Sequence, residues 1–201
     1  MTITIIQALQ KGVEAHENGR LREADKYYRA IIGSYPNHPD ANHNLGILIA
    51  ERDDPRRALY FFKIALEANP NEGRYWLSYI DTLIRLNELK YAEQLVKKAE
   101  QAGLKVTSLD KVKNALDKAI EKNSLLKLEL NNLTDLYNRG ELSKGLAVAH
   151  ELIKKFPRNP TVLNITGIIN HRLGAHYTAI KNYLTALKYQ PNSPQILNNL
   201  A

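Results

Sequence analysis

The sequence lacks cysteine altogether, so it can form neither disulfide bonds nor thiolate metal sites. No apolar run approaches the roughly 20 residues that a helix needs to cross a bilayer. Residues 1–10 carry neither the basic segment nor the small-residue cleavage site of a secretory leader. These absences fit a reducing compartment, and we expect a cytoplasmic protein that does not contact a membrane.

The sequence motifs of common enzymes are missing as well. The chain has no glycine-rich phosphate loop and no His-Glu-x-x-His pair, and it has no Gly-x-Ser-x-Gly elbow. Gly174 separates His171 from His176, so we expect this histidine pair to straddle a turn rather than face one metal site. The sequence therefore predicts no catalytic residue, no metal and no cofactor.

A period of 34 residues runs through the chain. Pro36 and Pro70 lie 34 residues apart, and so do Pro157 and Pro191. Other residue pairs keep the same spacing: Gly12 and Gly46, Ala24 and Ala58, Tyr28 and Phe62, Leu133 and Gly167, Gly145 and Ala179, Ala149 and Tyr183. Short turn signals separate apolar segments of helical periodicity between these landmarks. A fixed period of this length predicts stacked helical units, which expose a long surface and usually bind rather than catalyse.

The repeated unit resembles the tetratricopeptide repeat, a pair of antiparallel helices. The family pattern places Leu-Gly in the first helix, Ala-x-x-x-Phe/Tyr in the second and Pro after it. The second unit matches throughout: Leu45, Gly46, Ala58, Phe62 and Pro70. The first and fifth units keep most of the pattern, whereas the third retains Trp76 and Ala92 and the fourth retains Pro157. The resemblance implies an all-α fold, a tetratricopeptide-repeat α-solenoid of antiparallel helix pairs.

The small and aromatic residues of the pattern have a packing explanation. Gly12 and Gly46 are expected where two helices cross closely, because a larger side chain would push the axes apart. Tyr28, Phe62 and Tyr183 are expected to fill the space between neighbouring helix pairs.

The middle of the chain holds more residues than the repeats require. Pro70 and Pro157 lie 87 residues apart, which is 19 more than two periods. The 19 extra residues predict one more helix, which carries Leu109, Val112, Leu116 and Ile120 on one side. We expect repeats one to three in residues 1–106, a capping or connecting helix in 107–123, and repeats four and five with the start of a sixth in 124–201. The extra helix could end-cap the first three repeats or bulge from a continuous superhelix.

The positive charge lies in the second half of the chain. Residues 1–104 hold 14 Lys/Arg and 14 Asp/Glu, whereas residues 105–201 hold 14 and 7, so the whole net charge of +7 lies there. No acidic residue follows Glu151. This half could dock an acidic partner or nucleic acid, or the charges could be solvated helix faces, because they are scattered rather than clustered.

The resemblance implies that the first helices of successive repeats line a concave groove. The residue two before the glycine position forms one column: Gln10, Asn44, Ser78, Asn131, Ile165, Asn199. In O-linked N-acetylglucosamine transferases an asparagine ladder at this position holds the backbone of an extended peptide, which suits an amide that donates and accepts at once. Adjacent groove candidates are His43, Arg74, Asn138, Asn164 and Arg172. The alternative is that asparagine serves local packing and solubility.

A second binding mode of the family, the clamp for a chaperone's C-terminal carboxylate, is not expected. Leu9 and Val13 stand where the clamp needs Lys and Asn, and Ser78 stands where it needs Arg. Leu9, Val13 and Ile47 make the near end of the groove apolar, which suits an apolar segment or a neighbouring helix.

Residues 194–201 begin a first helix without a second, so we expect a piece of a longer protein. Arrays of this kind resemble the N-terminal part of bacterial glycosyltransferase or sulfotransferase proteins and the superhelix of O-linked N-acetylglucosamine transferases. The first hypothesis is a non-catalytic scaffold that binds a protein or peptide partner in the groove. The alternative is a polyanion- or nucleic-acid-binding module in the basic half. Self-association through residues 1–9 or 196–200 is a third hypothesis.

Overall fold

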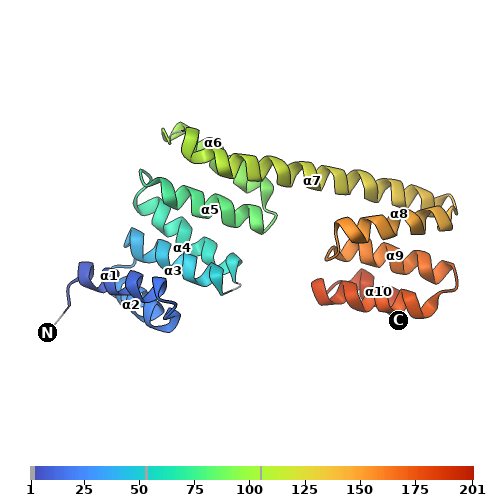
Figure 1. The fold of residues 1–201 in the computed structure, drawn as a ribbon, viewed down its shortest axis with the longest axis horizontal. Coiled ribbons are helices and arrows are strands. Elements are labelled where there is room, and N and C mark those ends of the chain that lie inside the picture. Colours follow the sequence, from blue (N-terminus) through green and yellow to red (C-terminus); the bar gives the residue numbers. More distant parts are fainter. Residues whose placement is uncertain (1–2, 53, 105) are drawn as a thin grey trace. The chain divides into compact units, whose positions relative to one another are not determined.

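The computed structural model describes residues 3–52, 54–104 and 106–201, the side chains of 106–108 excepted. Within these residues the chain forms eleven helices and no strand (Figure 1). The helices are α1 (Ile5–Glu17), α2 (Leu21–Ser34), α3 (Pro39–Glu51), α4 (Pro55–Ala68), α5 (Gly73–Arg85), α6 (Leu89–Gln101), α7 (Val106–Asn138), α8 (Leu142–Lys155), α9 (Pro160–Arg172), α10 (His176–Tyr189) and α11 (Pro194–Leu200). The predicted all-α solenoid is confirmed.

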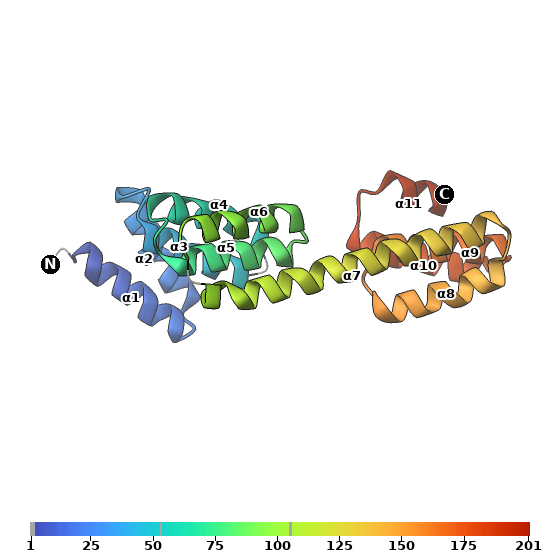
Figure 2. The same ribbon diagram turned by 90° about the horizontal axis from the view of Figure 1, so that it is seen from above.

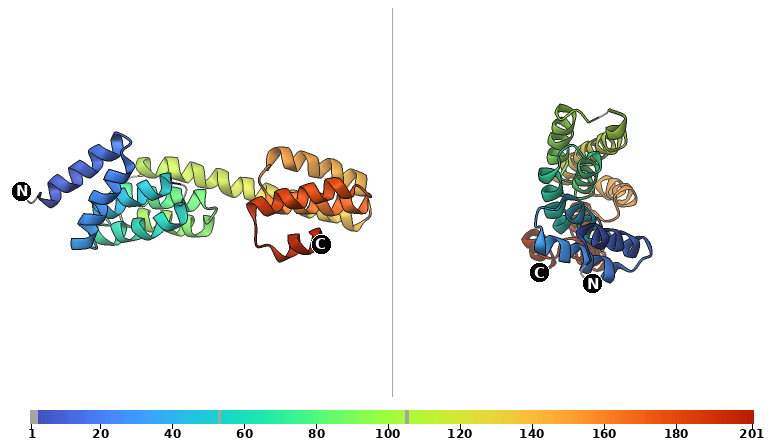
Figure 3. Two further views of the ribbon diagram at one scale, coloured as in Figure 1. Left: turned by 90° about the horizontal axis from the view of Figure 1, so that it is seen from below. Right: turned by 90° about the vertical axis from the view of Figure 1, so that its left-hand side faces the viewer.

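The chain divides into two compact units, Met1–Glu121 and Lys122–Ala201, which we call unit 1 and unit 2. In unit 1 the pairs α1–α2, α3–α4 and α5–α6 stack in chain order, and in unit 2 the helices α8, α9 and α10 follow α7 (Figure 1). The boundary lies inside α7, a single helix of 33 residues (Figures 2 and 3). The predicted extra helix and the first helix of repeat four thus form one element, since no glycine or proline occurs between Gly103 and Gly140 to interrupt it.

The turns within the helix pairs follow the predicted punctuation. Gly19, Gly140 and Gly174 adopt the left-handed conformation, with φ of 70°, 76° and 80°. Asn87 takes the equivalent place between α5 and α6 with φ of 60°, and asparagine is one of the few other residues that tolerate this conformation. These short reversals make the two helices of each pair antiparallel neighbours.

The glycines of the first helices face aromatic rings of the second helices at close range. A Cβ atom added to Gly46 would lie 2.7 Å from Cε1 of Phe62, and one added to Gly12 would lie 2.6 Å from Cε1 of Tyr28. Both rings are buried. The predicted close crossings are confirmed, and glycine is needed because any side chain would collide with the ring.

The first half of α7 belongs to the core of unit 1. Leu109, Val112 and Leu116 are buried in one cluster with Trp76 and Ile80 of α5 and with residues of α6. An ion pair between Lys113 and Glu100 joins α7 to α6 at the edge of this cluster. The apolar face that α5 and α6 leave open is therefore covered by α7.

The core of unit 2 has two clusters. Leu133 of α7 packs in one cluster with Leu152 of α8, with Phe156 directly after α8, and with Ile169 of α9. Leu163 of α9, Tyr183 and Ala186 of α10 and Ile196 of α11 form the second cluster. None of the described helices is both long and apolar enough to span a membrane.

Candidate peptide-binding surface

A pocket of about 520 Å³ lies in unit 1 where α1, α2 and α3 meet. Asn44, the second member of the predicted column, lines it together with apolar side chains of all three helices. The lining residues are Val13, His16, Glu17, Gly19, Leu21, Tyr28, Asn44, Ile47 and Glu51. The pocket therefore places an amide among apolar side chains and the polar groups of His16, Glu17 and Glu51. The amide suits a peptide backbone, and the apolar side chains suit an apolar side chain of a ligand.

Charged and polar groups at one side of this pocket are held in place. Nε2 of His16 and Oε2 of Glu51 lie 2.8 Å apart and link α1 to α3. Burial, and then the charges of Glu17 and Glu51, raise the pKa of Tyr28 to about 12. The phenol of Tyr28, which lines the pocket with Asn44, is therefore a neutral hydroxyl at physiological pH.

His43 lies beneath the surface and not on it. Its side chain is buried between the rings of Phe62 and Tyr75, with centroid distances of 5.7 and 4.9 Å. Nε2 lies 2.9 Å from Oγ of Ser78, and Nδ1 lies 3.4 Å from Oδ1 of Asn44. Burial lowers the pKa of His43, so the imidazole is neutral. A neutral ring that donates from Nδ1 to Asn44 accepts the Ser78 hydroxyl at Nε2.

Unit 2 repeats this arrangement with other residues. Asn164 and Asn199 follow His43 and Ser78 by 121 residues, the interval that also separates Gly46 from Gly167. Nδ2 of Asn199 donates to Oδ1 of Asn164 at 2.9 Å. In both units, a buried residue on one first helix holds the column residue on the next.

Arg74 and Arg172 are both exposed but occupy different surroundings. Arg74 forms an ion pair with Asp40 on the preceding first helix, and the hydroxyl of Tyr75 donates to the same carboxylate at 2.6 Å. Burial and this hydrogen bond raise the pKa of Tyr75. The guanidinium of Arg172 stacks over the ring of Tyr137, 5.0 Å from its centroid.

Asn131 and Asn138 are exposed on α7, and neither side chain has a hydrogen-bond partner among the described residues.

Of the predicted site residues, the structure brings together His43, Asn44 and Ser78 in unit 1, and Asn164 and Asn199 in unit 2. The sequence did not single out His16, Glu51 or Asp40. The 34-residue period relates Asp40 to Arg74, whereas His16 and Glu51 lie 35 residues apart, an interval that the period alone does not select.

The histidine pair straddles the turn at Gly174 as predicted, with His171 in α9 and His176 at the start of α10. The rings of His171 and His176 meet edge to face with centroids 5.0 Å apart, because the turn at Gly174 brings the end of α9 beside the start of α10. No group of three or more His, Cys, Asp or Glu that could hold a metal ion occurs in the described part of the chain.

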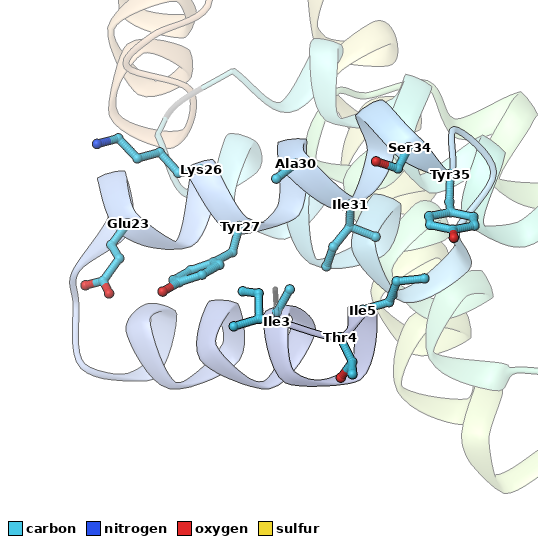
Figure 4. A pocket seen from close by; sticks show the side chains of 11 residues that line it. Ile3, Thr4, Ile5, Glu23, Lys26, Tyr27, Ala30, Ile31, Ser34 and Tyr35 are labelled. Atoms are coloured by element: carbon cyan, nitrogen blue, oxygen red, sulfur yellow. The ribbon is translucent and has the colours of Figure 1, made fainter. Parts of the chain in front are cut away.

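A second pocket in unit 1, of about 450 Å³, lies between α1 and α2 near the start of α1 (Figure 4). Ala8 lines it at the position where α3 carries Asn42 and α5 carries Trp76. Those two side chains donate to the carbonyl oxygens of Pro36 and Pro70, at 2.8 and 2.7 Å. The first repeat carries only the methyl group of Ala8 at this position.

A family model described as tetratricopeptide repeat matches residues 9–72 and 130–194. No curated protein matches the chain. The P58(IPK) TPR domain is similar with a TM-score of 0.61 at 11% identity; the match covers 98% of this chain, which spans 63% of that one.

Two further solved structures are similar over most of the chain. A tetratricopeptide repeat protein from Parabacteroides merdae matches with a TM-score of 0.54 at 16% identity, over 98% of this chain and 82% of that one. MamA from Desulfovibrio magneticus matches with a TM-score of 0.51 at 16% identity, over 96% and 99%. At these identities the likeness concerns the fold.

Proposed function

Because this chain belongs to the tetratricopeptide repeat family, we propose that it is a scaffold that binds an extended peptide or partner segment along its first helices. Proteins built on this repeat generally mediate protein–protein interactions, and the fold is typically a non-catalytic scaffold. The observation that carries the proposal is the pocket around Asn44, in which a half-buried amide lies beside the apolar side chains of Val13 and Ile47.

In this proposal Asn44 pairs with a peptide group of the ligand, and Val13 and Ile47 receive an apolar side chain. His43 is a positioning residue: it is buried, and it keeps Asn44 and Ser78 in place from below. Arg74 and Ser78 extend the surface in unit 1. In unit 2 the corresponding contacts would come from Asn131, Asn138, Arg172 and Asn199, with Asn164 supporting Asn199.

The organisation of the chain is part of the proposal. We infer that residues 107–123 act as the end-capping helix of repeats one to three, which is supported by the burial of Leu109, Val112 and Leu116 against α5 and α6. That the chain is the N-terminal arm of a larger bacterial protein remains a prediction of the resemblance, and its cytoplasmic location remains a prediction of the composition.

The test is peptide selection against the full chain, followed by affinity measurement. A random-sequence peptide library displayed on phage supplies the ligand, and fluorescence anisotropy gives its Kd. Replacing Asn44 by Ala should weaken binding by about tenfold, because one amide hydrogen-bond pair with a buried partner is lost. Asn71→Ala, in the α4–α5 turn, is the control and should leave the Kd unchanged. Equal affinity of the Asn44→Ala variant and the unaltered chain would refute the assignment.

The alternative, a polyanion-binding unit 2, rests on charge. Residues 122–201 hold 10 Lys/Arg and 4 Asp/Glu. All four acidic residues form ion pairs, whereas Lys127, Arg158, Lys181 and Lys188 have none among the described residues. These cations are spread over several helices, so we place this alternative second. A salt titration of binding to a single-stranded oligonucleotide decides it: phosphate contacts give a steep loss of affinity with salt, and an absent or flat response excludes it.

A further inference from the structure

We propose that the pocket around Asn44 is a subsite for the side chain of a lysine or arginine of the bound peptide, an assignment that rests on the function proposed above. All residues that line the pocket belong to α1, α2, α3 and the turn between α1 and α2. The subsite therefore lies within unit 1, between helices that are neighbours in the stack.

Each of two facing walls of the pocket pairs an apolar residue with a carboxylate one helical turn further on. Val13 precedes Glu17 by four residues on α1, and Ile47 precedes Glu51 by four residues on α3. Residues four apart lie on one side of a helix, about 6 Å apart along its axis. The four-carbon stem of a lysine covers about this length. The stem would lie along Val13 and Ile47, and its charged end would reach Glu17 and Glu51.

The hydroxyl of Tyr28 is a buried polar group that awaits a partner in this pocket. Only 1% of Tyr28 is exposed, yet the residue lines the pocket, and its hydroxyl has no hydrogen-bond partner among the described residues. After burial, the charges of Glu17 and Glu51 are the causes that raise the pKa of Tyr28, so both carboxylates act on this hydroxyl. An ammonium or guanidinium group has several N–H donors, and it can donate to the hydroxyl oxygen and to the carboxylates together.

The chain itself supplies no lysine or arginine to the two carboxylates among its described residues. Oε2 of Glu51 contacts Nε2 of His16 at 2.8 Å, whereas Glu17 forms no ion pair within the described part of the chain. Arg20, directly after the turn, pairs with Glu23 at 3.1 Å instead. A cation of the ligand would therefore meet unneutralised negative charge.

Acidic residues occupy this place in the groove only in the first two repeats. The residue five after the glycine position forms a second column along the first helices: Glu17, Glu51, Arg85, Asn138, Arg172. A basic side chain of the peptide would be attracted between α1 and α3 and repelled at Arg85 and Arg172. The column thus sets the register of the peptide as well as its composition.

The test selects peptides with the full chain and identifies the residues that they share. A random-sequence peptide library displayed on phage is selected in parallel against the unaltered chain, Glu17→Gln/Glu51→Gln, and the control Glu67→Gln/Glu93→Gln, which removes the same charge from α4 and α6. We expect enrichment of lysine or arginine with the unaltered chain and the control, and none with Glu17→Gln/Glu51→Gln. Because the whole chain has a net charge of +7, diffuse attraction would enrich acidic peptides instead.

Affinity measurements then assign the cation to the pocket. In a selected peptide, norleucine in place of the shared lysine or arginine should raise the Kd by about fivefold or more on the unaltered chain, and by less than about twofold on Glu17→Gln/Glu51→Gln. Tyr28→Phe should raise the Kd of the basic peptide by about fivefold, because the hydroxyl is lost. Repeat two carries Phe62 at the same place, so this variant keeps the ring packing and is expected to fold.

Failure of the subsite can be told apart from failure of the peptide-binding function. Selected peptides that bind through Asn44 but share no lysine or arginine would overturn the subsite and leave the groove in place. A shared cation whose replacement weakens binding equally on the unaltered chain and on Glu17→Gln/Glu51→Gln would overturn it as well. Selection of no peptide by the full chain would overturn both proposals.

Discussion

Replacing Gly167 by alanine is expected to destabilise unit 2, even though alanine is the better helix former. A Cβ atom at this position would lie 2.3, 2.6 and 2.9 Å from three atoms of the Tyr183 ring. The ring is buried in the cluster with Leu163 and Ile196, so it cannot turn away without displacing its neighbours. The substitution therefore stabilises the helix backbone but destabilises the packing around the Tyr183 ring.

The two contributions can be compared. Replacing glycine by alanine within a helix stabilises the helix by about 1 kcal/mol. Overpacking a well-filled core costs about 1–3 kcal/mol, and a contact of 2.3 Å falls at the upper end of that range. The net expectation is a loss of about 1–2 kcal/mol, which for a chain of this size lowers the melting temperature by roughly 2–8 °C.

Gly145 offers a matched control in the same unit. It lies in α8, where an added Cβ would be 3.4 Å from Cδ1 of Ile169 and 3.7 Å from Cβ of Leu136, ordinary contact distances. Gly145→Ala should therefore stabilise unit 2 by up to about 1 kcal/mol, because only the helix-propensity term remains.

The assay is urea and thermal denaturation followed by circular dichroism, with hydrogen exchange to assign the effect to unit 2. Stacked repeats can unfold unit by unit, so a global midpoint alone is not sufficient. The reasoning predicts opposite signs for the two variants. If Gly167→Ala stabilised the chain as much as Gly145→Ala does, the ring contact would not be the reason for the glycine.

Two further predictions concern unit 1. Because burial lowers the pKa of His43 below its ordinary value of 6.5, the folded state resists protonation, so stability is complete above that value and falls as the pH drops below it. The urea midpoint should therefore fall more between pH 7 and pH 5 in the unaltered chain than in the His43→Gln variant, and equal falls would contradict this. Leu109→Ala should cost about 2–5 kcal/mol in urea denaturation, because it opens a cavity where α7 covers α5 and α6. Leu128→Ala, exposed on the same helix, should change stability by less than about 0.5 kcal/mol, and equal effects would refute the capping role of α7.

Most of the fold could be predicted from the sequence, because its signals are local and repeated. Gly46 and Phe62 lie within one period, on the two helices of one pair. The close approach of Gly46 to the Phe62 ring follows from that helix pair. The turn at Asn87 could be predicted in the same way, from its alignment with Gly19. The length of α7 was harder to predict, because the absence of a helix breaker is a weaker signal than its presence.

The candidate site could be predicted only in part. The column through Asn44 and Ser78 followed from the repeat register. The roles within it did not: His43 was predicted as a surface residue, yet it is buried and bonds Ser78 from below. Register places a residue on a helix, but burial depends on which neighbouring side chains lie over it, and these come from other repeats.

The sequence by itself determined the helical class, the period of the stack and the small-and-large pairs that hold each helix pair together, because all of these depend on residues close in the chain. Only the tertiary structure decided which side chains of successive repeats bond. His16 with Glu51, His43 with Ser78 and Asn164 with Asn199 are each 35 residues apart. That interval is one period plus one residue, and the bonds depend on how neighbouring first helices pack against each other, which no single repeat contains.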